Sequence, residues 1–180
     1  MNRVVHRLEV ISSEIIIVAA REEDCMSMPR SEKIHCIADI VPGKASLGGL
    51  YTGLSYANVR HSFVAACDMP FLNISLVSYL FQLSPAFDVI VPRAAGLAEP
   101  LHAVYSANCV PHLKKLIDED KLSILDLFPL VKVRYVDEDE LNQFDPEHLS
   151  FFNINTETDL GVAKSILKEG KLKTKSHGND

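Results

Sequence analysis

The sequence lacks several features that would assign it to a familiar class of protein. It has no apolar run near the ~18 residues that a membrane-spanning helix needs, and no basic and apolar leader at its start. Its formal net charge is −6, so it lacks the positive surface that is typical of nucleic-acid-binding proteins. These absences predict a cytoplasmic protein that acts on neither a membrane nor a nucleic acid.

The four cysteines also lack any pattern that would point to a metal or redox site. Cys25, Cys36, Cys67 and Cys109 stand far apart, with no CxxC pair and no His/Cys ligand spacing. We therefore expect reduced thiols that pack as small apolar side chains. There is no GxSxG motif and no cysteine with a visible base partner, so the sequence predicts no covalent nucleophile.

What is present is the composition of an ordinary soluble domain, with 180 residues, 47% hydrophobic and 23% charged. Residues 1–170 are expected to form a single domain and residues 171–180 a disordered tail. The main strands are expected at 14–20, 34–37, 63–67, 87–91, 101–105 and 132–136. Helices are expected at 2–11, 74–83, 111–118, 123–128 and 156–170, and another follows the glycine-rich turn after Pro42 and ends at about residue 57. This alternation predicts an α/β fold, a mostly parallel sheet with helices on both faces.

The stretch Phe63–Leu72 begins with a predicted buried strand, and an acidic residue follows that strand directly. Nothing polar interrupts the run until Asp68, and Pro70 then forces a turn before the next helix. Asn73 is placed to cap that helix. Because ligands of open α/β sheets bind beyond the carboxyl ends of the strands, Asp68 is predicted to stand at a ligand crevice.

A second acid, Asp39, follows the predicted strand 34–37 in the same way. If the two strands are neighbours, Asp39 and Asp68 face one crevice, which would suit a Mg²⁺-nucleotide site. The alternative left open is that Asp39 is a turn residue and that Asp68 caps its own turn.

The stretch Pro42–Leu54 is rich in glycine without matching a standard phosphate-binding loop, either GxxxxGK[ST] or GxGxxG. Gly48 and Gly49 in a first helical turn each cost roughly 1 kcal/mol of helix stability, so their presence indicates that a neighbouring group needs the space that a side chain would occupy. That room serves either a ligand or the close packing of a helix on a sheet.

Two later segments carry polar side chains that fit either a ligand site or a structural role. Asn153 and Asn155 project to one face of an extended run, where they either hold a polar ligand or satisfy loop backbone. Glu99 and His102 flank a predicted strand entrance, and a lone histidine there is more often a structural hydrogen-bonder than a catalyst.

Taken together, five segments resemble the MobA family, the molybdenum cofactor guanylyltransferases. They occur in the family's order and are Glu14–Ala19, Asp39–Leu54, Ala66–Leu72, Glu99–Tyr105 and Phe151–Thr156. The combination of the aspartate-glycine stretch with CDMPFL and FFNIN is specific, whereas each segment alone is weak. The resemblance covers residues 1 to about 168.

The resemblance implies a Rossmann-like nucleotidyltransferase that joins GMP from GTP to a molybdopterin-type cofactor and releases pyrophosphate. It implies that Asp39 contacts the guanine nucleotide, that Asp68 binds Mg²⁺ and the nucleotide as the catalytic residue, and that Asn153 and Asn155 lie on the pterin side. The implied partners are GTP, the molybdenum cofactor and proteins of molybdoenzyme maturation.

The sequence departs from the family pattern at its beginning. The family opens with a strand and a glycine-rich loop of the form LAGGxSxRMGxDK, whereas Met1 here falls inside the helix that follows that loop. We therefore expect the first strand of the fold to be missing, with sheet edges and apolar helix faces exposed. Two explanations remain: a start site upstream of Met1, or a remnant with little activity that serves as a binding or partner module. A related transferase that uses CTP or a sugar phosphate is a third possibility.

Overall fold

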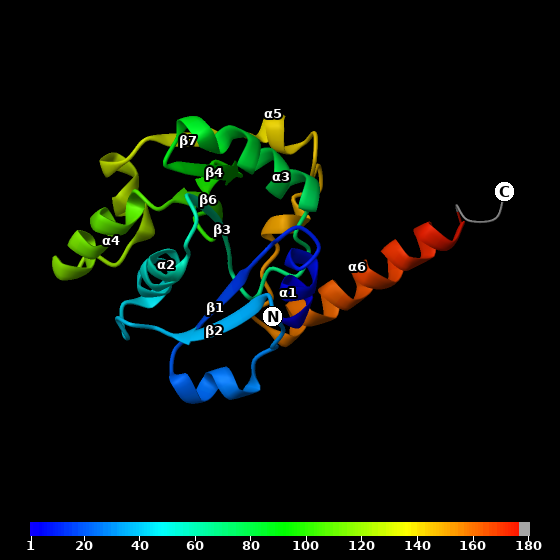
Figure 1. Ribbon diagram of the computed structural model, residues 1–180. Coiled ribbons are helices and arrows are strands. Elements are labelled where there is room, and N and C mark those ends of the chain that lie inside the picture. Colours follow the sequence, from blue (N-terminus) through cyan, green and yellow to red (C-terminus); the bar gives the residue numbers. More distant parts are fainter. Residues whose placement is uncertain (177–180) are drawn as a thin grey trace.

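A computed structural model describes residues 1–176, whose strands form two separate sheets (Figure 1). In the first sheet, β1 (Ile15–Ala19) lies parallel to β2 (Ile34–Ala38). The second sheet has the order β3 (His61–Ala65), β6 (His102–Ser106), β4 (Val89–Ala94) and β5 (Leu97–Ala98), and β7 (Val133–Val136) also pairs with β4.

The predicted α/β layering is confirmed, but the sheet is mixed rather than mostly parallel. Strands β1 and β2 run parallel, as do β4 and β7, whereas β6 is antiparallel to both β3 and β4. The reason lies in the connection from β4 to β6. Only residues 95–101 join them, including β5, and a parallel crossover needs about a dozen residues or more.

Helices alternate with these strands along the chain. The α-helices are α1 (Asn2–Leu8), α2 (Ala45–Tyr56), α3 (Ile74–Leu83), α4 (Cys109–Asp118), α5 (Glu138–Leu141) and α6 (Glu157–Ser176). The 3₁₀ segments are η1 (Glu22–Ser27), η2 (Ser84–Ala86), η3 (Ile124–Leu130) and η4 (Leu149–Phe151). Of these, η1, η2, α5 and η4 lie in stretches where the sequence predicted no helix.

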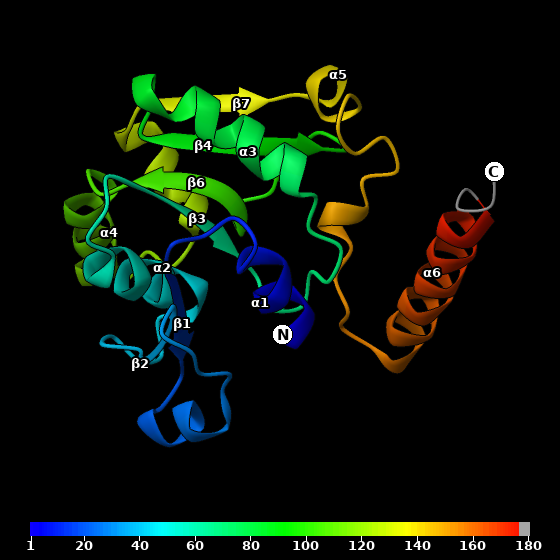
Figure 2. The same cartoon turned by 45° about the vertical axis from the view of Figure 1, so that its right-hand side comes forward.

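The core of the second sheet is divided between its two faces. Val89 and Val91 of β4 pack with helices α2 and α4, whereas Ile90 packs with α3 on the opposite face. Successive residues of a strand point to opposite faces, so helices on both sides are needed to bury this apolar run. Figure 2 shows α3 on one side of the sheet, with α2 and α4 on the other.

The strands expected to be buried on both faces are less covered than predicted near the amino end. Every residue of β3 is only partly buried, and in β1 only the terminal residues Ile15 and Ala19 are buried. Strand β1 pairs with β2 alone and β3 with β6 alone, so each has one edge without a neighbouring strand. The expected open sheet edges are therefore present in the described part of the chain.

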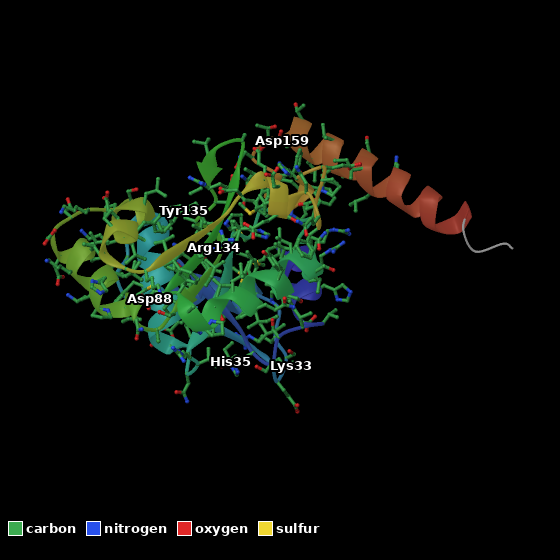
Figure 3. All side chains as sticks on the ribbon, turned by 90° about the horizontal axis from the view of Figure 1, so that it is seen from above. Lys33, His35, Asp88, Arg134, Tyr135 and Asp159 are labelled. Atoms are coloured by element: carbon green, nitrogen blue, oxygen red, sulfur yellow. A yellow bond between two sulfur atoms is a disulfide. The ribbon has the colours of Figure 1, made fainter. Side chains whose placement is uncertain are left out.

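Helix α6 begins with the predicted cap but ends later than predicted. Thr156 Oγ1 accepts a hydrogen bond from the Asp159 amide (3.1 Å), and Asp159 Oδ2 accepts one from the Thr156 amide (2.8 Å). Figure 3 shows Asp159 at the start of this helix. The helix was expected to end at Gly170 and continues to Ser176, while the rest of the expected tail, residues 177–180, lies outside the described residues.

Candidate functional site

Asp68 lies in the turn that follows β3, at the carboxyl end of that strand. Asn73 caps the next helix as predicted, since its side-chain oxygen accepts hydrogen bonds from the amides of Ser75 (2.9 Å) and Leu76 (3.1 Å). Asp68 Oδ1 is shielded from solvent and has no hydrogen-bond partner within residues 1–176, so it does not cap its own turn. An unpaired buried oxygen costs roughly 1–3 kcal/mol. A cation or a donor from a ligand would remove that cost.

Helix α1 holds the Asp68 turn through two arginines that sequence reasoning missed. Arg3 Nε donates to the carbonyl oxygen of Pro70 (3.0 Å), and Arg7 Nη1 donates to the carbonyl oxygen of Leu72 (2.7 Å). Burial, together with the charge of Arg7, lowers the pKa of Arg3. The signal that was available is their spacing of four residues, which places both on one face of a helix.

The segment with Asn153 and Asn155 lies directly beside the Asp68 turn. The Ile154 amide donates a hydrogen bond of 3.0 Å to the Asp68 carbonyl oxygen. Asn153 is half-buried and Asn155 exposed, and in the described part of the chain neither side chain is paired with a protein group. Sequence reasoning expected these carboxamides either to hold a ligand or to satisfy loop backbone, and the structure provides no support for the second.

Asp39 is already engaged by the protein, as the turn interpretation predicted. Its Oδ1 accepts hydrogen bonds from Thr52 Oγ1 (2.7 Å) and from the Val41 amide (3.0 Å). A Cβ at Gly48 would lie 2.9 Å from Asp39 Oδ2 and 3.1 Å from the Val41 carbonyl oxygen. Gly48 therefore provides room for the approach of α2 to the loop after β2. A Cβ at Gly49 would meet nothing within 4 Å.

The two acids do not follow neighbouring strands. Asp39 comes after β2, which pairs with β1 alone, whereas Asp68 comes after β3, which pairs with β6 alone. The condition under which both would face one crevice is therefore not met by direct strand pairing. Within the described residues no group of three or more His, Cys, Asp or Glu side chains is placed to hold a metal. A Mg²⁺ ion commonly uses only one or two protein carboxylates, so Asp68 alone fits such an ion.

His102 is not the structural hydrogen-bonder that the sequence indicated. The side chain is fully buried, and neither ring nitrogen has a partner among the described residues. Its ring packs edge-on against Phe63 and Phe151, with both ring centroids 5.0 Å away. Burial lowers its pKa from 6.5 to about 4, although the charge of Asp145 opposes that shift. His102 is therefore neutral at pH 7. Burial also raises the pKa of the neighbouring Glu99.

The prediction of four reduced thiols is wrong for two of them. Cys25 of η1 and Cys36 of β2 form a disulfide with a Cα–Cα distance of 5.5 Å. Their separation of 11 residues matches no metal motif and gives no sequence signal for pairing, since the sequence predicted no regular element at η1. Cys67, beside Asp68, is free and exposed, and Cys109 is free and buried.

No helix within residues 1–176 combines the length and apolar character required to cross a membrane.

Relatives of known name share most of this chain. It is 32% identical over 171 residues to a protein named probable molybdenum cofactor guanylyltransferase from Pelotomaculum thermopropionicum, covering 95% of this chain and 82% of that one. It is 28% identical over 173 residues to the molybdenum cofactor guanylyltransferase of Desulfosudis oleivorans, covering 96% of this chain and 84% of that one.

Solved structures agree with the sequence comparison. The molybdopterin-guanine dinucleotide biosynthesis protein A of Archaeoglobus fulgidus superimposes with a TM-score of 0.81 at 27% identity, over 93% of this chain and 85% of that one. A 2-C-methyl-D-erythritol 4-phosphate cytidylyltransferase of Thermus thermophilus shares the fold alone, with a TM-score of 0.68 at 12% identity, over 93% of this chain and 88% of that one. The predicted nucleotidyltransferase fold is thereby confirmed. The family model described as MobA-like NTP transferase domain matches residues 1–130, and the chain belongs to that nucleotidyltransferase family.

Proposed function

We propose that this protein transfers GMP from GTP to a molybdopterin-type molybdenum cofactor and releases pyrophosphate. The observation that carries the proposal is Asp68 Oδ1, a shielded carboxylate oxygen without a partner at the carboxyl end of β3. Such an atom is suited to a Mg²⁺ ion, which supplies charge neutralisation for the phosphates of a bound nucleotide. The names of the relatives support the choice of GTP and of the pterin acceptor.

In this proposal the protein contributes positioning rather than a covalent intermediate. A phosphate oxygen of the pterin cofactor attacks the α-phosphorus of GTP in line, and the bond from that phosphorus to the bridging oxygen of the β-phosphate breaks. Pyrophosphate leaves with the electron pair of the broken bond. Asp68 orients the nucleotide, and the Arg3 and Arg7 hydrogen bonds fix the turn that carries it. Holding both reactants in this geometry is the main source of rate enhancement for such a transfer.

The acceptor side of the site is proposed to be the Phe151–Asn155 segment. The hydrogen bond from Ile154 to Asp68 keeps Asn153 and Asn155 next to the Asp68 turn, and their side chains are not paired with protein groups in the described residues. Amide groups can both donate to and accept from a polar ligand such as a pterin. Asp39 keeps its proposed contact with the guanine nucleotide through Oδ2, since Oδ1 is engaged by Thr52 and Val41.

The test measures Mg²⁺-dependent pyrophosphate release from GTP in the presence of molybdopterin, with CTP, ATP and UTP as a panel. Two forms are compared, the 180-residue chain and a form with a family member's glycine-rich segment placed ahead of Asn2. We expect both forms to release pyrophosphate with GTP, and Asp68→Asn to lower the release by about 10²-fold or more in each, since electrostatic and metal contacts dominate this chemistry. Full activity of Asp68→Asn, or preference for another nucleotide, would contradict the proposal.

A second function is favoured by one observation, the half-covered strands β1 and β3. In that alternative the chain is a nucleotide- or pterin-binding module that does not catalyse the transfer by itself. The same assay separates the two, because release by the extended form alone would support the module, whereas release by the 180-residue chain would exclude it. Partnership with molybdoenzyme-maturation proteins belongs to either version of the proposal.

We also propose the cytoplasm as the location, because a nucleotidyltransferase draws on the nucleoside triphosphates there. The Cys25–Cys36 disulfide is unusual for this location, because cytoplasmic thiols are generally kept reduced.

A further inference from the structure

The turn formed by residues 99–102 stands at the same sheet edge as Asp68, and the reaction proposed above makes no use of it. Strands β3 and β4 are each antiparallel to β6, so both end at the edge of the second sheet where β6 begins. Figure 2 shows β6 between these two strands. The turn lies directly before β6, and the His102 amide closes it by donating a hydrogen bond of 3.0 Å to the Glu99 carbonyl oxygen. Because ligands of α/β sheets bind beyond the carboxyl ends of the strands, the turn borders the ligand region of Asp68.

This turn contacts both halves of the proposed site. On the nucleotide side, the Leu101 carbonyl oxygen accepts a hydrogen bond of 3.0 Å from the Ala66 amide, two residues before Asp68. On the acceptor side, the ring of His102 packs edge-on against Phe151, with 5.0 Å between the ring centroids. Phe151 begins the segment proposed for the pterin. The turn is therefore joined both to the strand end that carries Asp68 and to the acceptor segment.

The backbone of the turn is fixed by further hydrogen bonds. The Glu99 amide donates to the carbonyl oxygen of Pro92 in β4 (2.9 Å), and the Tyr105 hydroxyl donates to the carbonyl oxygen of Pro100 (2.7 Å). Tyr105 is fully buried, and a buried tyrosine hydroxyl normally requires such a partner. A turn held in this way presents its side chains to a ligand with little loss of conformational entropy on binding.

The Glu99 carboxylate is half-buried, and within residues 1–176 it has no hydrogen-bond or ionic partner. Burial raises its pKa, and no neighbouring cation opposes that shift. The buried acid Asp145 differs, because its Oδ2 accepts a hydrogen bond of 2.8 Å from the Ser150 amide. Removing a carboxylate from water without a partner costs free energy, which donors from a ligand would restore.

The donors that suit this carboxylate are two parallel N–H groups of a neutral ring. Phosphate groups are anionic and would be repelled by Glu99. The 2-amino-4-oxo-pyrimidine ring, which pterin and guanine share, carries a ring N–H beside an amino N–H, and a carboxylate can accept both at once. The contact between His102 and Phe151 favours the pterin as the source of this ring, because it ties the turn to the acceptor segment.

We propose that Glu99 recognises the 2-amino-4-oxo ring of the acceptor pterin, accepting one hydrogen bond from the ring N–H and another from the 2-amino group. Glu99 is then a specificity-determining residue, which selects a ring with an amino group over one with an oxygen at the same carbon. The inference rests on the proposed function for the identity of the acceptor, but it does not depend on catalysis.

The test measures the binding of two fluorescent probes to the purified chain, 6-hydroxymethylpterin and its 2-oxo counterpart 6-hydroxymethyllumazine. We expect the wild type to bind the pterin at least about tenfold more tightly, because the lumazine places an oxygen against the carboxylate. In Glu99→Gln the carboxamide can donate to that oxygen and accept from the ring N–H, so the preference should vanish or reverse. A purely structural role of Glu99 would instead weaken both probes equally.

Two further variants and a second pair of ligands complete the test. Glu99→Asp retains a carboxylate and should retain a preference for the pterin. Glu32→Gln alters an exposed acid before the amino end of β2 and should bind both probes as the wild type does. Urea unfolding of Glu99→Gln should show unchanged or raised stability, because an unpaired half-buried charge is removed. Titrations with GTP and with ITP, which lacks the 2-amino group, examine guanine in the same way.

Three results would overturn the proposal. Equal weakening of both probes in Glu99→Gln would leave the residue a structural role only. A changed preference between GTP and ITP, with the pterin preference intact, would assign the carboxylate to guanine. Failure of the wild type to bind either pteridine probe would remove the ligand. None of these readouts follows pyrophosphate release, so the proposed transfer reaction stands or fails separately in its own assay.

Discussion

Strands β1 and β6 show how differently two five-residue strands of one molecule are covered. Strand β1 has the sequence Ile-Ile-Ile-Val-Ala and leaves its three central residues only partly buried. Strand β6 has the sequence His-Ala-Val-Tyr-Ser, contains three polar side chains, and is buried at every residue. The difference follows from neighbours, because β6 lies between β3 and β4 whereas β1 has β2 on one edge alone. Burial thus reflects position in the sheet more than hydrophobicity of the strand.

Truncating leucines in the two regions should give the largest contrast. Leu80 of α3 is fully buried against the second sheet, whereas Leu8 of α1 is half-buried against the first. We expect Leu80→Ala to lower the free energy of unfolding by about 4 kcal/mol and Leu8→Ala by about 1 kcal/mol, because only the first leaves a closed cavity. Urea denaturation of both variants measures this, and equal losses would mean that the two regions are covered alike.

Acid should weaken the well-covered region through His102. Its folded pKa of about 4 lies below the ordinary value of 6.5, so the unfolded chain takes up this proton first as the pH falls. The stabilisation from the neutral buried ring is complete above pH 6.5 and is lost as the pH falls toward 4, by about 3 kcal/mol in all.

The measurement compares the wild-type chain with His102→Leu in urea at pH 7 and at pH 4. The carboxylates contribute to both proteins, so the difference between their pH dependences isolates the histidine. Parallel dependences would show that the ring of His102 is accessible to protons in the folded state.

Reduction should weaken the less covered region. The Cys25–Cys36 disulfide ties η1 to β2 across 11 residues, and closing a loop of that size stabilises a fold by roughly 2–3 kcal/mol. Dithiothreitol should therefore lower the midpoint of thermal unfolding of the wild-type chain and leave that of Cys36→Ala unchanged. Cys67→Ser, which alters the free exposed thiol, should retain the response to reductant.

The smallest effect is expected from two adjacent glycines of α2. Gly48→Ala should lower the free energy of unfolding by about 1 kcal/mol, because its Cβ would lie 2.9 Å from Asp39 Oδ2 and 3.1 Å from a backbone oxygen. Gly49→Ala should raise it by about 0.5–1 kcal/mol, since the position is open and alanine favours a helix. Effects of the same sign would show that the two positions share one environment.

Much of the fold could be predicted from local pattern. The boundaries of α3, the Asn73 cap and the Thr156–Asp159 capping box depend on residues close in sequence, and the structure agrees with them. The reversed direction of β6 depends on the seven residues before it, which are too few for a parallel crossover, and the predicted alternation of strands and helices does not show this. The short helix α5 and the 3₁₀ segment η4 carry too few turns to give a periodic signal.

The site residues could be predicted only where a polar or acidic side chain stands at a recognisable position of a predicted strand or extended segment. An acid at the end of an apolar strand marked Asp68, and the repeated Asn153 and Asn155 marked the neighbouring segment. The arginines of α1 were missed because their targets are carbonyl oxygens more than sixty residues away. The Cys25–Cys36 pair was missed because their approach depends on how η1 lies against β2.

The central claim, that Asp68 holds a divalent cation together with a nucleotide, is tested most directly by electron paramagnetic resonance with Mn²⁺ in place of Mg²⁺. With GTP present, the wild-type chain is expected to bind Mn²⁺, and Asp68→Asn to bind it about tenfold or more weakly. The control Asp120→Asn alters an exposed acid whose partner is Lys44 and should bind as the wild type does. Equal Mn²⁺ affinity in all three forms, or no binding by any of them, would contradict the account.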